Sequence, residues 1–379
     1  MHSMRPTRAT IDLANLSFNF HSVRKFIGRE MKIMAVVKAN AYGHGAAECA
    51  KSIESAGADW FGVATIGEAL ELREAGIIRP ILTLGGVWPG EEGLILRENI
   101  TPAIFDLQTA GLIDKAAADR GVRKKVHIKI DTGMGRVGVP FQDVAGFAER
   151  LSAFKSLEVE GAMTHFAAAD DLDENEYTEK QVVRFNNAVN ILREYGFSPE
   201  IIDLSNSPGA VAHPEIVGNM VRLGGVLYGL SGDILPAGIK KPELRPVMSL
   251  TSELALVKKV NAGESLGYNR TFVAKRDSVI GTAPIGYNDG LRRGLSNNGN
   301  AIVNGVRAPI VGRVSMDWTI LDLTEVSDPQ KGDDVVFIGS NGEASITAEE
   351  LAGSLKTLSY EITCGISYRV PRLYRSENC

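Results

Sequence analysis

The chain has 379 residues, 44% of them hydrophobic and 23% charged, a globular composition long enough for two domains that excludes a fibrous or disordered protein. Its net charge of -5 argues against a basic surface for nucleic acid. The three cysteines, Cys49, Cys364 and Cys379, are widely spaced, which predicts no disulfide framework and no metal site. We see no signal-peptide-like segment and no apolar run of ~18 residues, so we expect a cytoplasmic protein without membrane contact.

From about residue 30 to residue 230, short apolar runs alternate with helical patterns. The runs that read as strands are Lys32–Lys38, Asp59–Thr65, Pro80–Leu84, Thr101–Phe105, Lys125–Asp131, Leu157–His165, Glu200–Leu204 and Met220–Leu227. The helical patterns include Gly67–Ala75, Leu107–Arg120 and Glu174–Tyr195. Eight such units predict an α/β fold with an N-terminal (β/α)8 TIM-like barrel over residues 10–240. A doubly wound open sheet is the alternative, but no G-x-G-x-x-G motif follows the first strand.

After about Leu244 the pattern changes to strands joined by turns. The strand candidates are Val247–Val260, Ser278–Ile285, Ala301–Val314, Thr319–Leu323 and Asp334–Gly339, with one helical pattern, Thr347–Leu355. Asn304-Gly305 is a hairpin-turn signal. We therefore expect a mostly β C-terminal domain over residues 241–379, reached through the linker Pro236–Pro246, and the first few residues are a candidate to pack with it.

Lys38 ends the first predicted strand and opens a loop of small residues in the string AVVKANAYGHG. Barrel enzymes place catalytic groups at the carboxyl ends of their strands. A lysine there can be desolvated and can form a Schiff base with a carbonyl cofactor such as pyridoxal phosphate. The alternative is an ordinary strand-end lysine that reaches solvent.

Other polar residues lie on the later predicted strands, at their carboxyl ends or just after them. They are Lys129, Asp131, Arg136, His165, Asn206, Ser207 and Arg222. Taken singly, His165 reads as a structural histidine and Arg222 as an ion-pair partner, but clustering at one face favours a site. Hydroxyls of Tyr42 and Ser207, with the backbone N–H groups of Gly224 and Gly225, are suitable donors to a phosphate.

Lys129 lies in a strand where apolar and polar residues alternate. The Val/Ile set suits the helix layer, so His127, Lys129 and Asp131 should point into the barrel. A buried ammonium must be paired, neutralised or modified. An interior ion pair of the Lys129–Asp131 type is the simplest alternative.

These strings together closely resemble the alanine racemases, pyridoxal-phosphate enzymes with an N-terminal barrel and a C-terminal β domain. The motifs that carry the resemblance are RATIDL (Arg8–Leu13), AVVKANAYGHG, KIDTGMGRVG (Lys129–Gly138), MTHFA, SNS (Ser205–Ser207), VRLGGVLYG (Val221–Gly229), ESLGYN (Glu264–Asn269), PIGYNDG, VGRVSMD (Val311–Asp317) and YEITCGIS (Tyr360–Ser367). They span nearly the whole chain. Asn269 departs from the pattern, since glycine is common after Tyr268.

The resemblance implies a two-base racemisation of alanine on a pyridoxal-phosphate Schiff base, supplying D-alanine for bacterial peptidoglycan. Lys38 would carry the cofactor and act as one base, and Tyr268 from a partner subunit would act as the other. The residues that would hold the cofactor are Lys38, Tyr42, Arg136, His165, Asn206, Ser207, Arg222, Gly224, Gly225 and Tyr360. Those that would contact the substrate are Arg136, Met316, Tyr287 and Asp317. Lys129 would be modified to N6-carboxylysine, and the chain would form a head-to-tail homodimer with shared sites.

Three other functions remain open at this stage. A barrel-type amino-acid decarboxylase would share the fold, cofactor and lysine motif, but its EPGR string is absent here. A non-catalytic pyridoxal-phosphate-binding barrel would lack the β domain and Tyr268. A serine or broader-specificity racemase differs only in the pocket around the side chain, which Tyr360 is expected to crowd.

Overall fold

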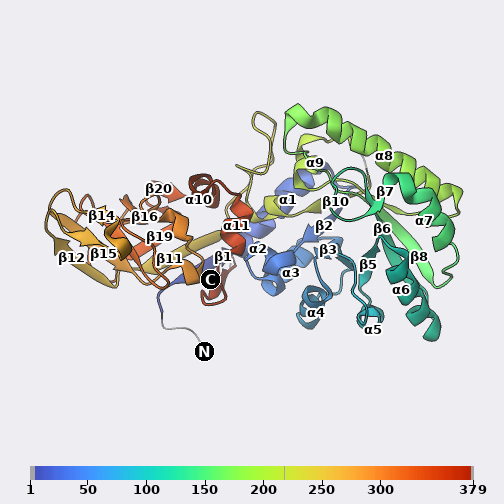
Figure 1. The fold of residues 1–379 in the computed structure, drawn as a ribbon, viewed down its shortest axis with the longest axis horizontal. Coiled ribbons are helices and arrows are strands. Elements are labelled where there is room, and N and C mark those ends of the chain that lie inside the picture. Colours follow the sequence, from blue (N-terminus) through green and yellow to red (C-terminus); the bar gives the residue numbers. More distant parts are fainter. Residues whose placement is uncertain (1–4, 217, 377–379) are drawn as a thin grey trace.

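A computed structural model describes residues 5–216 and 218–376, which form a barrel and a β domain (Figure 1). The barrel strands are β2 (Lys32–Val36), β3 (Trp60–Val63), β4 (Ile81–Thr83), β5 (Thr101–Ile104), β6 (Lys124–Asp131), β8 (Leu157–Met163), β9 (Ile201–Asp203) and β10 (Met220–Leu223). All neighbouring pairs are parallel, and β5 pairs with β6 to close the ring. A short β7 (Val139–Pro140) extends from β6. The predicted (β/α)8 barrel is therefore confirmed.

Helices cover the outside of the ring, in green and blue in Figure 1. They are α1 (Leu13–Ile27), α3 (Ala46–Ser55), α4 (Ile66–Glu74), α5 (Glu92–Arg97), α6 (Leu107–Asp119), α7 (Val144–Leu151), α8 (Asn175–Glu194) and α9 (Ser207–Ala212). A five-residue element, α2 (Lys38–Tyr42), directly follows β2. Short 3-10 turns lie at Phe141–Asp143, Leu172–Glu174, Gly225–Tyr228, Tyr268–Arg270, Tyr287–Asp289 and Arg293–Leu295. None of the described helices is long and apolar enough to cross a membrane.

The barrel interior holds a separate buried layer to which almost every strand contributes one side chain. Its apolar members are Met34, Trp60, Leu82, Ala103, Met163, Ile201 and Met220. Strand β6 adds His127, fully buried, with its ring 5.3 Å from that of Trp60. The interior is thus filled below the strand ends, and Lys129 and Arg222, two residues after His127 and Met220 on the same strands, lie nearer the carboxyl ends.

The C-terminal domain is built from mostly antiparallel sheets, largely in orange in Figure 1. Its strands are β11 (Met248–Glu253), β12 (Leu256–Val260), β13 (Ser265–Leu266), β14 (Phe272–Val273), β15 (Ser278–Ala283), β16 (Asn300–Val303), β17 (Val306–Pro309), β18 (Thr319–Asp322), β19 (Asp334–Asn341), β20 (Ala344–Ile346) and β21 (Arg372–Arg375). Its helices are α10 (Ala348–Leu355) and α11 (Ser359–Cys364). The expected mostly β architecture is confirmed, although the run Val247–Val260 divides into two strands of different sheets.

The N-terminal strand β1 (Arg8–Asp12) belongs to the same sheet as the C-terminal strands. It pairs antiparallel with β11 and parallel with β21. Its carboxyl end continues into α1 of the barrel, because Asp12 caps that helix by accepting the Asn15 N–H at 2.8 Å. The chain therefore passes between the two domains twice, after β1 and through the 236–246 segment, and α11 of the C-terminal domain also lies against α2 of the barrel.

Candidate active site

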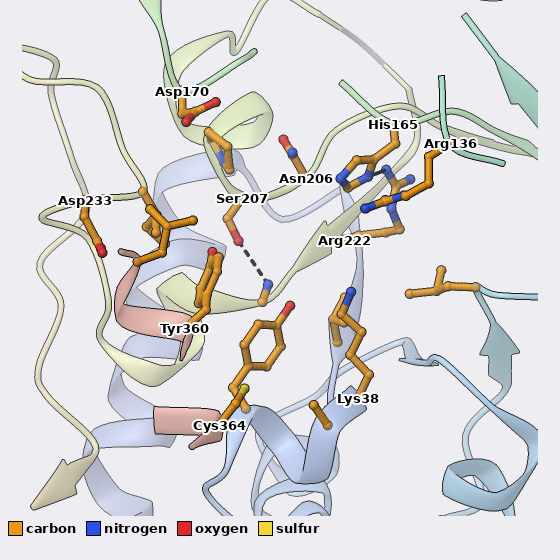
Figure 2. Close-up of a pocket in the computed structure, with 18 of the residues that line it drawn as sticks. Lys38, Arg136, His165, Asp170, Asn206, Ser207, Arg222, Asp233, Tyr360 and Cys364 are labelled. Carbon is orange, nitrogen blue, oxygen red and sulfur yellow. Dashed lines mark hydrogen bonds between the residues drawn. The ribbon is translucent and has the colours of Figure 1, made fainter. Parts of the chain in front are cut away.

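A cavity of about 470 Å3 lies at the carboxyl ends of the barrel strands and collects most of the predicted site residues (Figure 2). The predicted residues that line it are Lys38, Tyr42, Lys129, Arg136, His165, Asn206, Ser207, Arg222, Gly224 and Tyr360. In Figure 2, the side chains of Arg136, His165 and Arg222 gather on one side, and Ser207 and Tyr360 lie on the other. The cavity therefore has a cationic end and a hydroxyl-rich end, and Lys38 lies below Arg222 in this view.

Lys38 begins a turn whose backbone is left-handed. Ala39, Asn40, Ala41 and Tyr42 all have φ between 52° and 54°. A left-handed helical conformation costs an L-residue roughly 1–2 kcal/mol, so the four residues together cost on the order of 4–8 kcal/mol. The surrounding hydrogen bonds must hold this turn, because none of the four is glycine.

His44 is one of the residues that hold the turn. Its ring Nδ1 lies 2.9 Å from the Ala41 carbonyl oxygen and 3.0 Å from that of Tyr42. Burial lowers the pKa of His44 to about 4, so the ring is neutral and its Nδ1–H donates to both carbonyls. The ring also stacks on Tyr228, with centroids 4.6 Å apart.

The surroundings of Lys38 favour its neutral amine. Burial lowers the pKa of Lys38, and the cations Arg136 and Arg222 lower it further, against an opposing effect from Glu68. A neutral amine is the form that attacks a carbonyl carbon. Lys38 is thus prepared for nucleophilic chemistry rather than for an ordinary surface role.

Arg222 is buried and held from several directions. Its guanidinium forms an ion pair with the fully buried Asp203, donates to the Thr164 carbonyl at 2.7 Å, and lies 3.2 Å from His165 Nδ1. Burial, followed by the charges of Arg222 and Arg136, lowers the pKa of His165 to about 2. Neutral His165 accepts from Arg222 through Nδ1, which leaves its proton on Nε2.

Lys129 lies inside the barrel, as the alternation of its strand predicted. Its Nζ donates to the Leu84 carbonyl at 3.1 Å, whereas Asp131 accepts the backbone N–H groups of Gly133 and Gly135. The suggested Lys129–Asp131 ion pair is not among the described salt bridges. Burial, together with Arg222 and Arg136, lowers the pKa of Lys129 to about 8. Lys129 is buried near Arg222 and Arg136 and has no ion-pair partner among the described salt bridges, which makes it suited to modification.

The hydroxyl-rich end fits a phosphate group. The Gly224 N–H already faces Ser207 Oγ at 3.0 Å, the hydrogen bond drawn in Figure 2. A Cβ at Gly224 would lie 2.6 Å from the Tyr42 hydroxyl, and one at Gly225 would lie 2.6 Å from that of Tyr360. Burial raises the pKa of both tyrosines, so both hydroxyls stay protonated donors. With the Lys38 amine in the same cavity, these residues fit pyridoxal phosphate.

Five predicted residues do not line this cavity, and one of them, Gly225, directly follows the lining residue Gly224. Tyr268, Tyr287 and Met316 lie on the C-terminal domain with 69%, 42% and 51% of their surface exposed. Asp317 forms an ion pair with Arg369 at 2.8 Å. Tyr268 borders a separate surface hollow together with Arg313 and Trp318. A single chain therefore holds the cofactor end of the predicted site but not its second base.

Comparisons with known proteins give the family of this chain. Residues 11–232 match the family model "Alanine racemase, N-terminal domain", and residues 247–374 match "Alanine racemase, C-terminal domain". The chain belongs to the alanine racemase family. It is 44% identical over 375 residues to the alanine racemase of Geobacter sulfurreducens, covering 98% of this chain and 97% of that protein. The predicted family and enzyme class, an isomerase, are therefore confirmed.

Solved structures of alanine racemases have the same fold. The alanine racemase of Clostridium difficile 630 superposes with a TM-score of 0.93 at 36% identity, over all of this chain and 98% of that one. The Bartonella henselae alanine racemase, solved with covalently bound pyridoxal phosphate, gives 0.88 at 28% identity over 98% of this chain and 99% of that one. The fold class predicted for this alanine racemase family member agrees with both.

Sequence reasoning missed three residues around the cavity of this racemase family member. Asp233 lines the cavity and accepts from the Ser359 hydroxyl at 2.8 Å, which fixes the start of α11. Cys364, at the other end of α11, also lines the cavity, while Cys379 lies outside the described residues. Glu68, on α4, reaches the turn after Lys38. The local sequence does not reveal the contacts of Asp233 and Glu68 near the cavity, because Ser359 and Ala39 lie 126 and 29 residues away.

Proposed function

We propose that this member of the alanine racemase family interconverts L-alanine and D-alanine with pyridoxal 5'-phosphate as cofactor. The observation that carries the proposal is one cavity that holds the Lys38 amine, the guanidinium of Arg222, and a group of hydroxyl and N–H donors suited to a phosphate. Bound pyridoxal phosphate would supply an electron sink that makes the Cα–H bond of an amino acid acidic. Lys38 would hold the cofactor, and Tyr42, Asn206, Ser207, Gly224, Gly225 and Tyr360 would bind its phosphate end.

Proton transfer at Cα would be shared by two bases on opposite faces. Lys38, whose pKa is lowered by burial, would take and return the proton on the D face. The partner subunit's Tyr268 would act on the L face, because Tyr268 lies exposed on a different domain from Lys38. His165 would support that tyrosine through its Nε2 proton. A head-to-tail homodimer would thus complete two sites, with Met316, Tyr287 and Asp317 on the side where the substrate enters.

Arg222 would face the ring nitrogen of the cofactor. Arginine stays protonated, so it does not readily give up a proton to that nitrogen. The ring would then be a moderate electron sink, which favours return of the proton to Cα over transamination. Its ion pair with Asp203 holds the guanidinium in place for this role.

Lys129 would carry a carboxylate on Nζ, as N6-carboxylysine. Its pKa of about 8 leaves a substantial fraction of free amine near neutral pH, and the free amine is the form that adds carbon dioxide. The modified side chain would turn a cation into an anion facing Arg136. Arg136 would then be oriented toward the cofactor and the substrate carboxylate.

The substrate would be small, because Tyr360 closes the cavity beside Gly225 and Ile234. Serine, larger by one hydroxyl, is the second candidate, since an apolar pocket rejects an added hydroxyl only by roughly a hundredfold. We place the enzyme in the bacterial cytoplasm as a source of D-alanine for peptidoglycan. The domain limits proposed are 10–240 for the barrel and 241–379 for the β domain, except that β1 (Arg8–Asp12) pairs with strands of the β domain.

The test is a panel of amino acids in deuterated water with the purified, cofactor-loaded enzyme. We expect deuterium at Cα and formation of the opposite enantiomer fastest with alanine and at least about tenfold slower with serine. Faster exchange with serine or a basic amino acid would replace the substrate assignment. Release of carbon dioxide without exchange would replace racemisation by decarboxylation.

A further inference from the structure

The turn after Lys38 is tied to another unit of the barrel by a carboxylate. Glu68 Oε1 accepts the Ala39 N–H at 2.7 Å, and Glu68 Oε2 accepts the Ala64 N–H at 2.7 Å. The first contact is on the left-handed turn and the second is just after β3. One side chain thereby joins the loops that follow two neighbouring strands, β2 and β3.

Glu68 does more than cap its own helix. It is the third residue of α4 and forms a capping box with Thr65, but its contact with the Thr65 N–H is long, at 3.4 Å. Its two short hydrogen bonds go instead to Ala39 and Ala64. A capping role alone needs no contact with Ala39, so the carboxylate has a second function.

The contact at Ala39 lies at the residue where the backbone changes hand. Val37, before Lys38, has φ -118°, and Ala39 has φ 52° and ψ 48°. Lys38 stands between the two, and its carboxyl-side peptide group carries the Ala39 N–H, so a hydrogen bond to that N–H restrains the backbone of Lys38. The hydrogen bond to Glu68 fixes the N–H of the first left-handed residue, and Asn40 Oδ1 holds the end of the loop by accepting the Ala46 N–H at 2.8 Å.

We propose that Glu68 is a positioning residue for Lys38, which holds Ala39 in the left-handed conformation and thereby keeps the Lys38 amine in the cavity. The inference rests on the proposed function, in which Lys38 binds the cofactor. A carboxylate is required because two N–H groups converge on it. A glutamine has one acceptor oxygen, so its amide N–H2 would face either Ala39 or Ala64 with two donors opposed.

The test compares E68Q with E71Q, a matched control on the same helix, whose side chain is exposed. Each holoenzyme, saturated with pyridoxal phosphate, is reduced with borohydride, and the fraction of Lys38 trapped as the cofactor adduct is measured by peptide mass spectrometry. We expect E68Q to lower both the rate of trapping and kcat by about tenfold, the effect of losing one charge-assisted hydrogen bond. KM should stay within about twofold. E71Q should match the unmodified chain.

A rescue variant tests whether E68Q acts through the conformation of Ala39 or through the loss of the Glu68 negative charge. Glycine adopts the left-handed conformation without steric cost, so E68Q/A39G should recover most of the lost trapping rate and kcat. Failure of this rescue, or an E68Q variant equal to E71Q, would overturn the inference. If E68Q does not fold by circular dichroism, Glu68→Asp, which keeps the charge but shortens the reach, should show the same loss, and no loss would overturn it. If the unmodified chain traps no cofactor on Lys38, the proposed function fails instead.

Discussion

The barrel cavity and the surface around Tyr268 are two halves of one proposed site, and they are built in opposite ways. The side chains of the cavity are restrained by many contacts. Arg222 alone has four hydrogen-bond or ion-pair partners, and Lys38 precedes a strained turn that side chains hold in place. Tyr268, Tyr287 and Met316 instead lie exposed on the β domain. Under the proposed function, the difference means that one chain would prepare the cofactor site, whereas the proposed second base would depend on assembly.

The largest effect expected is loss and recovery of activity on mixing subunits. Lys38→Ala and Tyr268→Phe should each lower racemisation on the order of 10³-fold or more, because each removes one of the two bases. When the two variants are mixed under conditions of subunit exchange, half of the dimers become mixed and each has one intact site. Activity should then return to about a quarter of the unmodified level.

The control for this experiment is a mixture of Lys38→Ala with Lys38→Arg, in which no intact site can form. Activity is measured as enantiomer formation after dilution from a range of protein concentrations. A mixture that stays inactive although mass analysis finds mixed dimers would refute a shared site. Full activity of a monomer would do the same and would place both bases on one chain.

Replacing Arg222 tests whether the buried half sets the reaction type. Arg222→Glu should replace a guanidinium that stays protonated with a carboxyl group that can exchange a proton with the ring nitrogen of the cofactor. The variant should also lose the hydrogen bonds to Thr164 and His165. Racemisation should fall on the order of 10²-fold, the cost of removing one prearranged charge. Transamination, measured as pyruvate formed per racemisation event, should rise. Unchanged partitioning between the two reactions would contradict the account of Arg222.

The sequence predicted the barrel well because its strands are buried on both faces and read as short apolar runs bounded by helices. It also predicted the cavity, since Lys38 and His165 follow the ends of β2 and β8 and Arg222 lies near the end of β10, and a closed barrel must bring these ends together. It did not predict the left-handed turn: Ala39, Asn40 and Ala41 include no glycine, and the conformation depends on Glu68, 29 residues away in the chain.

Two other features depended on contacts that local patterns do not contain. Asp233 holds α11 through Ser359, 126 residues later. Strand β1 pairs with strands near the end of the chain. Asn269 occupies a position where glycine is common in the family. Its φ is 59°, a left-handed conformation that asparagine tolerates better than most residues other than glycine. The departure from glycine after Tyr268 thus preserves the turn.

Carboxylation of Lys129 should raise activity by less than either proposed base contributes, and the rate of this carboxylation should depend on pH. Its amine, with a pKa of about 8, loses its proton as pH rises through that value, whereas a lysine in the unfolded chain keeps it to about 10.4. The enzyme is first refolded in CO2-free buffer, and the same concentration of dissolved carbon dioxide is then added at about pH 6.5 and about pH 8.5, below and above that pKa. Activity should recover faster at the higher pH, where more of the amine is free. Lys129→Ala should lower kcat ~10- to 100-fold.

The same shift predicts a pH dependence of stability for the unmodified amine. Because the unfolded chain binds the Lys129 proton more tightly, the free energy of unfolding should rise with pH between about 8 and 10.4. In Lys129→Met this rise should be smaller; Lys124, whose pKa burial also lowers to about 8, remains in the variant and supplies a contribution of the same sign. Equal slopes by denaturant titration would mean that the Lys129 pKa is not lowered.

The smallest effect expected comes from adding one methyl group to the phosphate end. In Gly225→Ala the new Cβ would lie 2.5 Å from Ile234 Cδ1 and 2.6 Å from the Tyr360 hydroxyl, so Tyr360 must move. Overpacking of this kind costs about 1 kcal/mol, which corresponds to about a fivefold weaker retention of pyridoxal phosphate. Retention is measured by the cofactor concentration that restores half of the activity after dialysis. Gly353→Ala, where a Cβ meets no atom within 4 Å, is the matched control and should bind like the unmodified chain. Equal retention by both variants would show that Tyr360 does not hold the phosphate, and the buried half of the site would then be less rigid than its contacts imply.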